Sequence, residues 1–349
     1  MNNMTSEFDI ITKILKDSIH ELEDKRILLI GSTGAISTYL GKYLIYIKKN
    51  NIINIDLTFT SRSKESLNKK YTVDELKYVE EILLDVRKPY GLNSSFDYII
   101  FAAGNADPKN IIKDPINIID SNYQGLYNLL SSLESKGTNT KIIFFSTREV
   151  YGLLNSKKEI TENDIGSLNQ LNFRSCYPEV KKLCENMLEC VAEINPNISY
   201  SIIRLAHIYG PFMNVENDGR IMNDLIGMTL NGKGIKLLSD GSAIRAFCYV
   251  ADAVTGIITA MSDKNHKSVF NLANEDEPIS IKELAFTIQK LYPERVPGIA
   301  FKNSDGNDNK NAYFFKERMV LSTERIRNLG WKPHFSLNNG LKLTINSYL

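Results

Sequence analysis

Four side chains have the types and spacing that acid–base chemistry on an alcohol requires. Thr147 and Glu149 come at the end of an apolar strand, and Tyr177 and Lys181 stand four residues apart on a predicted helix. Side chains four apart share a helix face, so we expect the phenol and the ammonium group to lie together. A neighbouring positive charge lowers the pKa of a tyrosine, which suits it to act as a base. A lone Tyr-x-x-x-Lys pattern more often marks a solvated helix face, so the elements around it decide its meaning.

The N-terminal half has the pattern of a dinucleotide-binding unit. A buried-strand run at residues 26–30 is followed at once by a glycine-rich turn and then a helix. Glycines let the backbone approach a pyrophosphate, and the helix N-terminus supplies amide donors and a positive dipole. Ser37 replaces the third glycine of the pattern and is small enough for the helix to pass close to the strand. The predicted dinucleotide-binding residues of this turn are Gly31, Ser32, Thr33, Gly34, Ala35 and Ile36.

The second strand, residues 55–60, leads into Ser61 and Arg62 without a carboxylate. Sites that select NAD usually have an acidic residue there, which accepts hydrogen bonds from the ribose 2′-hydroxyl. A hydroxyl group beside an arginine can instead hold the 2′-phosphate of NADP. Arg62 can also stack on the adenine edge or be solvated. Taken alone, this turn favours NADP.

Strands and helices continue to alternate through the first 205 residues, which predicts an α/β fold with a Rossmann-type, doubly wound parallel sheet. We therefore expect a dinucleotide-binding Rossmann domain over residues 25–205. The alternation weakens afterwards, and residues 206–349 are expected to form a smaller α/β lobe that mainly binds the substrate. Apolar residues at spacings of three and four predict a helical extension over residues 1–24. Residues 303–311, rich in Asn, Asp and Gly, are predicted to be a surface loop.

The composition is that of an ordinary globular protein. The chain has 349 residues, 43% of them hydrophobic, and a net charge of +1, so no global field attracts nucleic acid or a membrane surface. Four cysteines without Cys-x-x-Cys spacing indicate neither a disulfide framework nor a metal site. No apolar run is long enough to span a membrane, and no secretion signal pattern is present. We expect a cytoplasmic protein that has no nucleic-acid or membrane partner.

Three motifs together resemble the extended short-chain dehydrogenase/reductases that act on nucleotide sugars, the NAD(P)-dependent epimerase/dehydratase group. They are the glycine-rich turn, the Ser-Thr-x-Glu-Val-Tyr-Gly segment at residues 146–152, and the Tyr-x-x-x-Lys pair. Within that family, residues 218–252 resemble the UDP-glucuronate decarboxylases. The resemblance extends over residues 25–335, which is most of the chain.

The resemblance implies a role for each of the four catalytic candidates. Tyr177 would be the base on the sugar C4 hydroxyl, and Thr147 would hydrogen-bond the same hydroxyl. Lys181 would hold the nicotinamide ribose and lower the pKa of the tyrosine. Glu149 would order C5 of the sugar or a water molecule. The cofactor of the most similar family members is recycled internally, which favours NAD, with NADP possible.

The resemblance also implies further cofactor contacts. Asp85 and Val86, after the third strand, would border the adenine, and Asn122 would flank the active site. Small residues after the fourth strand would let the chain pass close under the nicotinamide-side ribose. These small residues are Ala102, Ala103 and Gly104.

Five residues are candidates for binding a nucleotide-diphosphate sugar. Arg174 and Arg245 match the decarboxylase pattern. Arg148 occupies the position of the catalytic aspartate of dehydratases, and a guanidinium is no useful acid at neutral pH, which argues against 4,6-dehydration. His207 stands where decarboxylases tend to have asparagine. Arg220 is a candidate for the diphosphate, or equally for a structural salt bridge.

The interpretation that the resemblance favours is a UDP-glucuronate decarboxylase-like enzyme. A C4 epimerase, 4-dehydrogenase or 4-reductase acting on a hexose or heptose would use the same core, and a 4,6-dehydratase is less favoured. A dinucleotide-binding regulator without activity is the alternative from another class. Family members commonly dimerise through the helix bearing Tyr177 and the helix before it, so a homodimer is expected. An apolar stripe that could serve this contact consists of Leu183, Met187, Leu188 and Val191.

Overall fold

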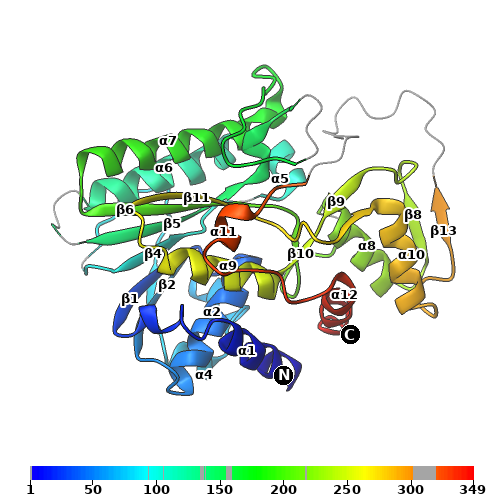
Figure 1. Cartoon of the computed structure of the whole chain (residues 1–349), viewed down its shortest axis with the longest axis horizontal. Helices are drawn as coiled ribbons and strands as arrows, with labels where there is room; N and C mark the ends of the chain where they lie inside the picture. The colour runs from blue at the N-terminus through cyan, green and yellow to red at the C-terminus, as the bar shows by residue number, and fades with distance from the viewer. Residues whose placement is uncertain are drawn as a thin grey trace.

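The computed structural model describes residues 2–92, 94–104, 106–133, 137, 139–154, 159–216, 218–301 and 320–349. The loop predicted at residues 303–311 lies outside these ranges. Most of the described chain is arranged around one large sheet, and a smaller part with short strands and helices stands beside it (Figure 1).

The large sheet has seven parallel strands in the order β11-β6-β5-β4-β1-β2-β3. The six strands β3-β2-β1-β4-β5-β6 have the order of dinucleotide-binding folds, which confirms the predicted fold class. The strands that cross the centre are almost fully buried because helices cover both faces, so their sequences are continuous apolar runs. The strands are β1 Lys25–Ile30, β2 Ile55–Ser61, β3 Glu80–Leu83, β4 Tyr98–Phe101, β5 Thr140–Thr147, β6 Ile198–Leu205 and β11 Lys267–Leu272.

Helices α6 and α7 lie side by side over one face of the sheet, and α2 and α9 cover the other face (Figure 1). Each face has its own buried apolar cluster. The helices of this part are α2 Ala35–Lys49, α3 Lys64–Asn68, α4 Val73–Leu76, α5 Pro108–Lys113, α6 Pro115–Leu133, α7 Cys176–Ile194, α9 Val250–Ser262 and α11 Glu324–Arg327, with the 3₁₀ turns η1 His20–Leu22, η2 Arg148–Tyr151 and η3 Phe173–Ser175.

The smaller part contains three two-stranded sheets and the helices α8, α10 and α12. Strand β11, from the range 206–349, belongs to the large sheet, and helix α9 of the same range packs on the sheet, so the C-terminal range contributes to both parts. The elements of the smaller part are β7 Ile208–Tyr209 with β10 Cys248–Tyr249, β9 Ile244–Ala246 with β12 Pro278–Ser280, β8 Ile235–Leu237 with β13 Ile299–Phe301, α8 Ile221–Leu230, α10 Ile281–Leu291 and α12 Leu337–Asn346.

The N-terminal extension forms helix α1, Asn2–Ile14, and packs against α2 and α9. Its buried Phe8 and Ile11 join the apolar cluster on that face. Glu7 is also buried, and its carboxylate accepts hydrogen bonds of 2.7 Å from both Tyr39 and Tyr249. The extension is therefore fixed to the body of the protein by both apolar and polar contacts.

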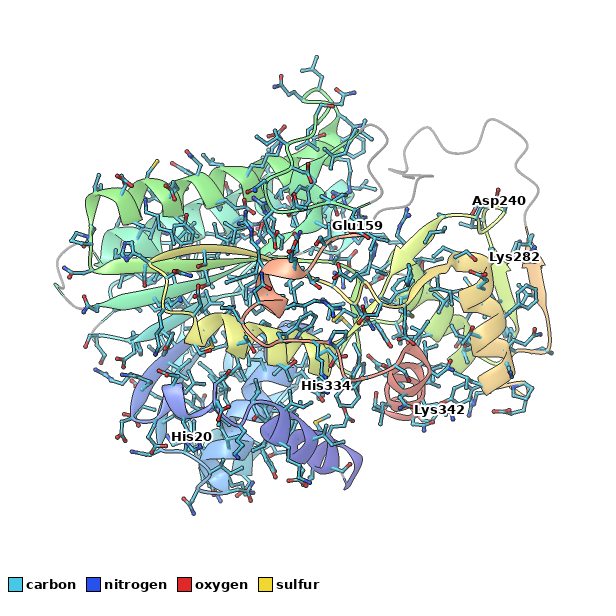
Figure 2. All side chains as sticks on the ribbon, in the orientation of Figure 1. His20, Glu159, Asp240, Lys282, His334 and Lys342 are labelled. Carbon is cyan, nitrogen blue, oxygen red and sulfur yellow. The ribbon has the colours of Figure 1, made fainter. Side chains whose placement is uncertain are left out.

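The segment from α11 to α12 is anchored to α9 by one buried carboxylate. Asp252 is fully buried and accepts hydrogen bonds from the backbone amides of His334 at 2.8 Å and Phe335 at 3.1 Å. Figure 2 shows His334 on this segment, and Lys342 on α12 further along the chain. The C-terminal segment thus connects α9 with the smaller part.

Candidate active site

Strand β5 ends at Thr147, which pairs with Leu205 on the neighbouring strand β6. The chain then turns into η2, and the Thr147 hydroxyl accepts a hydrogen bond of 3.2 Å from the Glu149 amide. The Thr147 side chain is also hydrogen-bonded to Tyr177. The structure therefore brings Thr147, Glu149 and Tyr177 together at the carboxyl edge of the sheet, where ligands bind in folds of this kind.

Tyr177 lies in the first turn of α7 and is 4% exposed. Burial raises the pKa of its phenol to about 12, and the negative charge of Glu149 also raises it. The hydrogen bond to Thr147 and the positive charges of Arg220 and Arg174 lower the pKa but do not offset burial. The sequence predicted that Lys181 lowers the pKa of Tyr177. The structure differs, because desolvation disfavours the phenolate and the pKa is raised.

Lys181 faces strand β5, as Tyr177 does, one helical turn further along α7. Its ammonium group donates a hydrogen bond of 2.7 Å to the Phe145 carbonyl and lies 4.6 Å from the centre of the Phe144 ring. Burial lowers the pKa of Lys181 to about 8. The strand backbone therefore holds the ammonium group in place, and its ring contact is of the cation–π kind.

Arg174 connects Glu149 with Tyr177. It stands in η3, just before α7, and donates a hydrogen bond of 3.0 Å to the Glu149 carboxylate. The guanidinium carbon lies 5.8 Å from the centre of the Tyr177 ring. Arg174 is 8% exposed, and within the described ranges its buried Nη1 has no hydrogen-bond partner. One donor of this guanidinium therefore remains available to a ligand.

His207 and Arg245 form another side of the site together with Arg148. His207 follows β6 with a left-handed backbone (φ +48°), and its ring lies 5.4 Å from that of Phe247. Burial, and then the charges of Arg148 and Arg245, lower the pKa of His207 well below its usual range, which favours the neutral imidazole. Arg245 on β9 donates a hydrogen bond of 2.7 Å to the Ile244 carbonyl, and burial and the charge of Arg148 lower its pKa to about 10.

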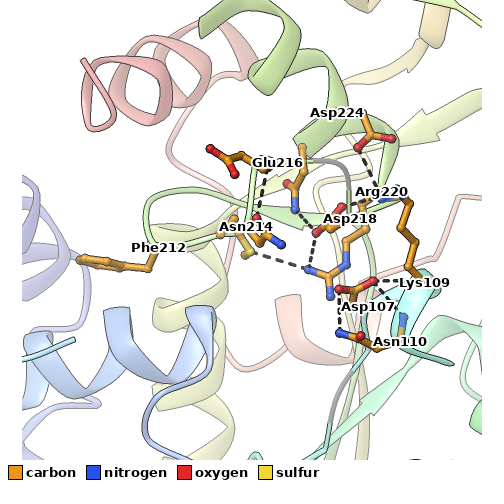
Figure 3. Close-up of polar contacts among 12 residues, drawn as sticks. Asp107, Lys109, Asn110, Phe212, Asn214, Glu216, Asp218, Arg220 and Asp224 are labelled. Atoms are coloured by element: carbon orange, nitrogen blue, oxygen red, sulfur yellow. Dashed lines mark hydrogen bonds and ion pairs between the residues drawn. The ribbon is translucent and has the colours of Figure 1, made fainter. Parts of the chain in front are cut away.

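Arg220 stands at the start of α8, where an ion pair holds it (Figure 3). Its amide donates a hydrogen bond of 2.8 Å to the carboxylate of Asp218, and its Nη1 lies 3.6 Å from the second oxygen. The Asp218 side chain is buried and also accepts a hydrogen bond from Asn223. The structural salt bridge is therefore present, and the positive charge of Arg220 also lowers the pKa of Tyr177.

The turn after β1 is packed tightly against the end of β4. Gly31 has φ +81°, and a Cβ added there would lie 2.9 Å from the Ala103 nitrogen and Cα. The Ser32 hydroxyl donates to the Thr60 carbonyl at 2.9 Å, which fixes the turn against β2. Gly34 is the N-cap of α2, and no side chain caps this helix end. Glycines in the turn and helix N-terminal amides without a side-chain cap fit a pyrophosphate, so these residues suit the predicted dinucleotide. The remaining residues of the turn, Thr33, Ala35 and Ile36, are half-buried.

Asn122 on α6 faces the residues that follow β4. Its side-chain amide donates to the Ile118 carbonyl at 2.8 Å, and within the described ranges its buried Oδ1 has no hydrogen-bond partner. Gly104 has φ +128°, and a Cβ there would lie 2.7 Å from that oxygen. Ala102 and Ala103 stand before it at the carboxyl edge of the sheet, half-buried.

The predicted adenosine side contains Ser61, Arg62 and Asp85. Ser61 is buried and donates to the Ser63 carbonyl at 3.1 Å, whereas Arg62 is exposed. Asp85 accepts hydrogen bonds of 2.9 and 3.1 Å from the Arg87 side chain, which lowers the pKa of Asp85 to about 2. The carbonyl of the next residue, Val86, accepts a hydrogen bond from Asn128 on α6.

Sequence reasoning missed three supporting residues. They are Asp218, which anchors Arg220; Phe247, which packs on His207; and Arg87, which pairs with Asp85. In two of these pairs an aspartate stands two residues before the arginine, and this spacing could have indicated the ion pair. The segments are Asp85-Val86-Arg87 and Asp218-Gly219-Arg220. No local pattern indicates Phe247, because its partner is forty residues away in the chain.

Comparisons with known proteins identify the family of this chain. The profile of the NAD dependent epimerase/dehydratase family matches residues 27–273. UDP-glucuronic acid decarboxylase 3 of Arabidopsis thaliana is 31% identical over 320 residues, which are 91% of this chain and 87% of that protein. The chain therefore belongs to the NAD dependent epimerase/dehydratase family.

Solved structures show the same fold. UDP-glucose 4-epimerase of Thermotoga maritima, solved with UDP-glucose, aligns with a TM-score of 0.75 and 21% identity, over 93% of this chain and 98% of that chain. MoeE5, solved with UDP-glucuronic acid and NAD, aligns with a TM-score of 0.72 and 19% identity over the same shares of the two chains.

The family and its members confirm the predicted class of protein. The chain is an NAD-dependent enzyme of the epimerase/dehydratase type. None of the helices in the described ranges is long and apolar enough to cross a membrane. In the same ranges, no group of three or more His, Cys, Asp or Glu side chains is placed to hold a metal ion.

Proposed function

We propose that this enzyme oxidises C4 of UDP-glucuronate and releases the C6 carboxylate as carbon dioxide. The observation that carries the proposal is the Glu149 carboxylate, held by Arg174 at 3.0 Å beside the hydrogen-bonded pair Thr147 and Tyr177. These residues, with Arg245, match the decarboxylase pattern. The Arabidopsis decarboxylase at 31% identity supports the same assignment.

Tyr177 is the proposed base on the C4 hydroxyl, and Thr147 orients that hydroxyl by a hydrogen bond. Bound NAD would supply the hydride acceptor for C4 and, in its reduced form, the hydride donor for the same carbon. Lys181 is positioned by the Phe145 carbonyl and holds the nicotinamide ribose. Its positive charge would then favour the phenolate, opposing the effect of burial on the pKa of Tyr177.

Loss of carbon dioxide follows from the ketone at C4. The C6 carboxylate is attached at C5, beside that ketone, so the electron pair of the C5–C6 bond moves to the carbonyl oxygen as the bond breaks. A proton then adds to C5 of the resulting enolate. Glu149, with its charge balanced by Arg174, orders the water or the carbon at this step. Tyr177 finally returns its proton to the C4 oxygen as C4 is reduced, and the product is a UDP-pentose.

A C4 epimerase that acts on the same hexuronate is the second candidate. Arg148 favours it, because a cation that binds the carboxylate stabilises it in the ground state and so opposes its loss. Arg148 also replaces the acid that a dehydratase needs for the leaving hydroxyl. Both candidates use the same base and the same oxidation at C4.

The test is two separate incubations of the purified enzyme with NAD, one with UDP-glucuronate and one with UDP-glucose, each followed by mass spectrometry and absorbance at 340 nm. We expect a UDP-pentose and no accumulation of NADH. A product with the mass of the substrate but a changed C4 would instead support the epimerase. Unchanged UDP-glucuronate, or loss of water from UDP-glucose, would contradict the proposal.

We also propose a homodimer through helices α6 and α7. The residues of the predicted apolar stripe do not all face the same way. Leu188 is fully buried against the sheet, whereas Leu183 is 45% exposed. Tyr123 and Tyr127 on the adjacent helix are also exposed, so an outward apolar surface spans both helices. Size-exclusion chromatography with light scattering tests this, and a monomer at micromolar concentration would contradict it.

A further inference from the structure

Glu185 lies on α7 one helical turn beyond Lys181. Residues four apart share a helix face, and Tyr177, Lys181 and Glu185 follow one another at this spacing. The Glu185 side chain is only 12% exposed. The carboxylate therefore lies on the same side of α7 as the proposed base and the lysine, towards the interior of the protein.

Glu185 connects α7 with the strand that carries Thr147. Its Oε1 accepts a hydrogen bond of 2.5 Å from the hydroxyl of Ser146, the residue directly before Thr147. Lys181 donates to the carbonyl of Phe145, one residue earlier, at 2.7 Å. Two successive turns of the helix are thus bonded to two successive residues of β5. These hydrogen bonds restrict sliding and rotation of α7 on the strand, and so fix where the phenol stands relative to the strand end.

Arg204 on β6 holds the same carboxylate by two hydrogen bonds. Its Nε donates to Oε1 of Glu185 at 3.1 Å, and its Nη2 donates to Oε2 at 2.6 Å, which is a bidentate contact. The remaining nitrogen, Nη1, donates to the Tyr151 hydroxyl and to the Glu162 carbonyl, both at 3.0 Å. All three nitrogens of the guanidinium are therefore engaged, and they hold the carboxylate in one place.

The negative charge of Glu185 acts on Lys181. Burial lowers the pKa of Lys181 to about 8, whereas Cys184 and Glu185 raise it. Burial also raises the pKa of the Cys184 thiol to about 11, so this thiol is neutral at neutral pH. The ion-paired carboxylate of Glu185 therefore favours the ammonium form of Lys181. Other titratable side chains that interact with Glu185 are Arg204, Tyr151 and Tyr200.

We propose that Glu185 is a positioning residue of the reaction, which fixes α7 on β5 and keeps Lys181 charged for the nicotinamide ribose of NAD. The inference rests on the proposed function for the role of Lys181, and it is independent of which sugar is converted. A charged Lys181 favours the phenolate of Tyr177. Glu185 thus acts on the base through the lysine, and not by contact with the sugar.

An ion pair with a structural role alone is the alternative. Such a pair would be lost equally on removal of either partner, so both removals would have the same effect on the site. The two roles can be separated because the negative charge belongs to Glu185 alone. Glu185→Gln removes this charge and retains one acceptor oxygen. Arg204→Met breaks the same ion pair but leaves the carboxylate beside Lys181.

The test is isothermal titration calorimetry of the full-length protein with NAD, from about pH 6 to about pH 9. We expect NAD affinity to fall as pH rises through about 8, because the ammonium group of Lys181 loses its proton. In Glu185→Gln the midpoint of this fall should move to lower pH by at least about 0.5. Arg204→Met should leave the midpoint in place or move it to higher pH. Glu185→Asp, which keeps the charge on a shorter side chain, should show a smaller shift than Glu185→Gln.

Glu189→Gln is the matched control, because this glutamate lies one further turn along α7 and its side chain is 49% exposed in an ion pair with Lys267. It should change neither the midpoint nor the affinity. Thermal unfolding of each variant checks that it folds. The same midpoint shift in Glu185→Gln and Arg204→Met would assign the pair a structural role alone and overturn the proposal. So would an NAD affinity of the unmodified protein that does not change with pH.

The titration contains no sugar, so its outcome does not depend on decarboxylation. A shifted midpoint in Glu185→Gln together with unreacted UDP-glucuronate would refute the proposed function and support the role of Glu185.

Discussion

At the scale of residues, the site combines a buried phenol with charged groups that pull its pKa in opposite directions. Burial and Glu149 raise the pKa of Tyr177, whereas Thr147, Arg174 and Arg220 lower it. The sequence predicted which side chains meet here, because strand ends and helix faces follow from spacing. It did not predict the raised pKa, since burial depends on the whole surrounding packing.

Replacement of Tyr177 by phenylalanine tests its role as the base. We expect Tyr177→Phe to lower kcat by about 10²–10⁴-fold, the usual contribution of a positioned acid or base. UDP binding should stay within threefold of the unmodified enzyme, as measured by calorimetry. The matched control is Tyr127→Phe, on a residue that is 50% exposed on α6. Retention of more than a tenth of the activity by Tyr177→Phe would contradict the assignment.

Removal of the guanidinium of Arg174 leaves the Glu149 carboxylate without its ion-pair partner. The Arg174 side chain is 10% exposed and that of Glu149 is 24% exposed, so the pair lies between the surface and the interior. We expect Arg174→Met to lower the free energy of unfolding by about 2 kcal/mol, between the values of exposed and buried pairs. Urea denaturation measures this, and Arg174→Lys should restore part of it. No loss of stability in Arg174→Met would show that the pair contributes little.

At the scale of elements, the strand–turn–helix unit at the N-terminus carries the dinucleotide site. The contact between Gly31 and Ala103 lets the turn pass close to the end of β4. A side chain at residue 31 would meet this backbone, and the left-handed φ would add strain. The geometry of the turn therefore depends on this glycine.

Gly31→Ala should weaken NAD binding at least tenfold and lower the thermal unfolding temperature, because the added Cβ displaces the turn. Gly298→Ala is the control, since a Cβ there meets nothing within 4 Å. Calorimetric titration with NAD measures the affinity of both variants. Unchanged NAD affinity in Gly31→Ala would show that this turn does not bind the cofactor.

Much of the element pattern could be read from the sequence. Continuous apolar runs and the glycine-rich turn predicted the parallel sheet, and the structure has it with the expected strand order. The addition of β11 to the sheet could not be predicted, because its partner β6 ends sixty-two residues before it begins. The ion pair of Arg174 with Glu149 could not be predicted from the sequence either, because only the packing of α7 on β5 brings the two segments together.

At the scale of the whole molecule, single buried carboxylates hold terminal segments to the body of the protein. Glu7 joins α1 to Tyr39 and Tyr249, and Asp252 joins α9 to the segment that contains His334. Burial raises the pKa of Asp252 to about 7, although two backbone hydrogen bonds lower it. The ionised form is therefore disfavoured in the folded state relative to the unfolded chain.

This predicts a pH dependence of stability. A carboxyl whose folded pKa lies above its unfolded value of 3.8 binds more protons in the folded state, so stability falls as pH rises towards 7. At about 1.4 kcal/mol per pKa unit, the fall is up to about 4 kcal/mol. Asp252→Asn, which keeps one acceptor oxygen, should lack this component when urea unfolding is followed from pH 4 to pH 8. Parallel curves for the two proteins would contradict the assignment.

The central claim is that the enzyme removes hydrogen from C4 of a hexuronate and later returns it to the same carbon. The most direct measurement uses UDP-glucuronate with deuterium at C4, incubated with the enzyme and NAD and analysed by NMR and mass spectrometry. The account predicts a UDP-pentose that retains the deuterium at C4 and gains one solvent hydrogen at C5, without net NADH. Loss of the deuterium to solvent, or a labelled substrate that remains unchanged, would contradict it.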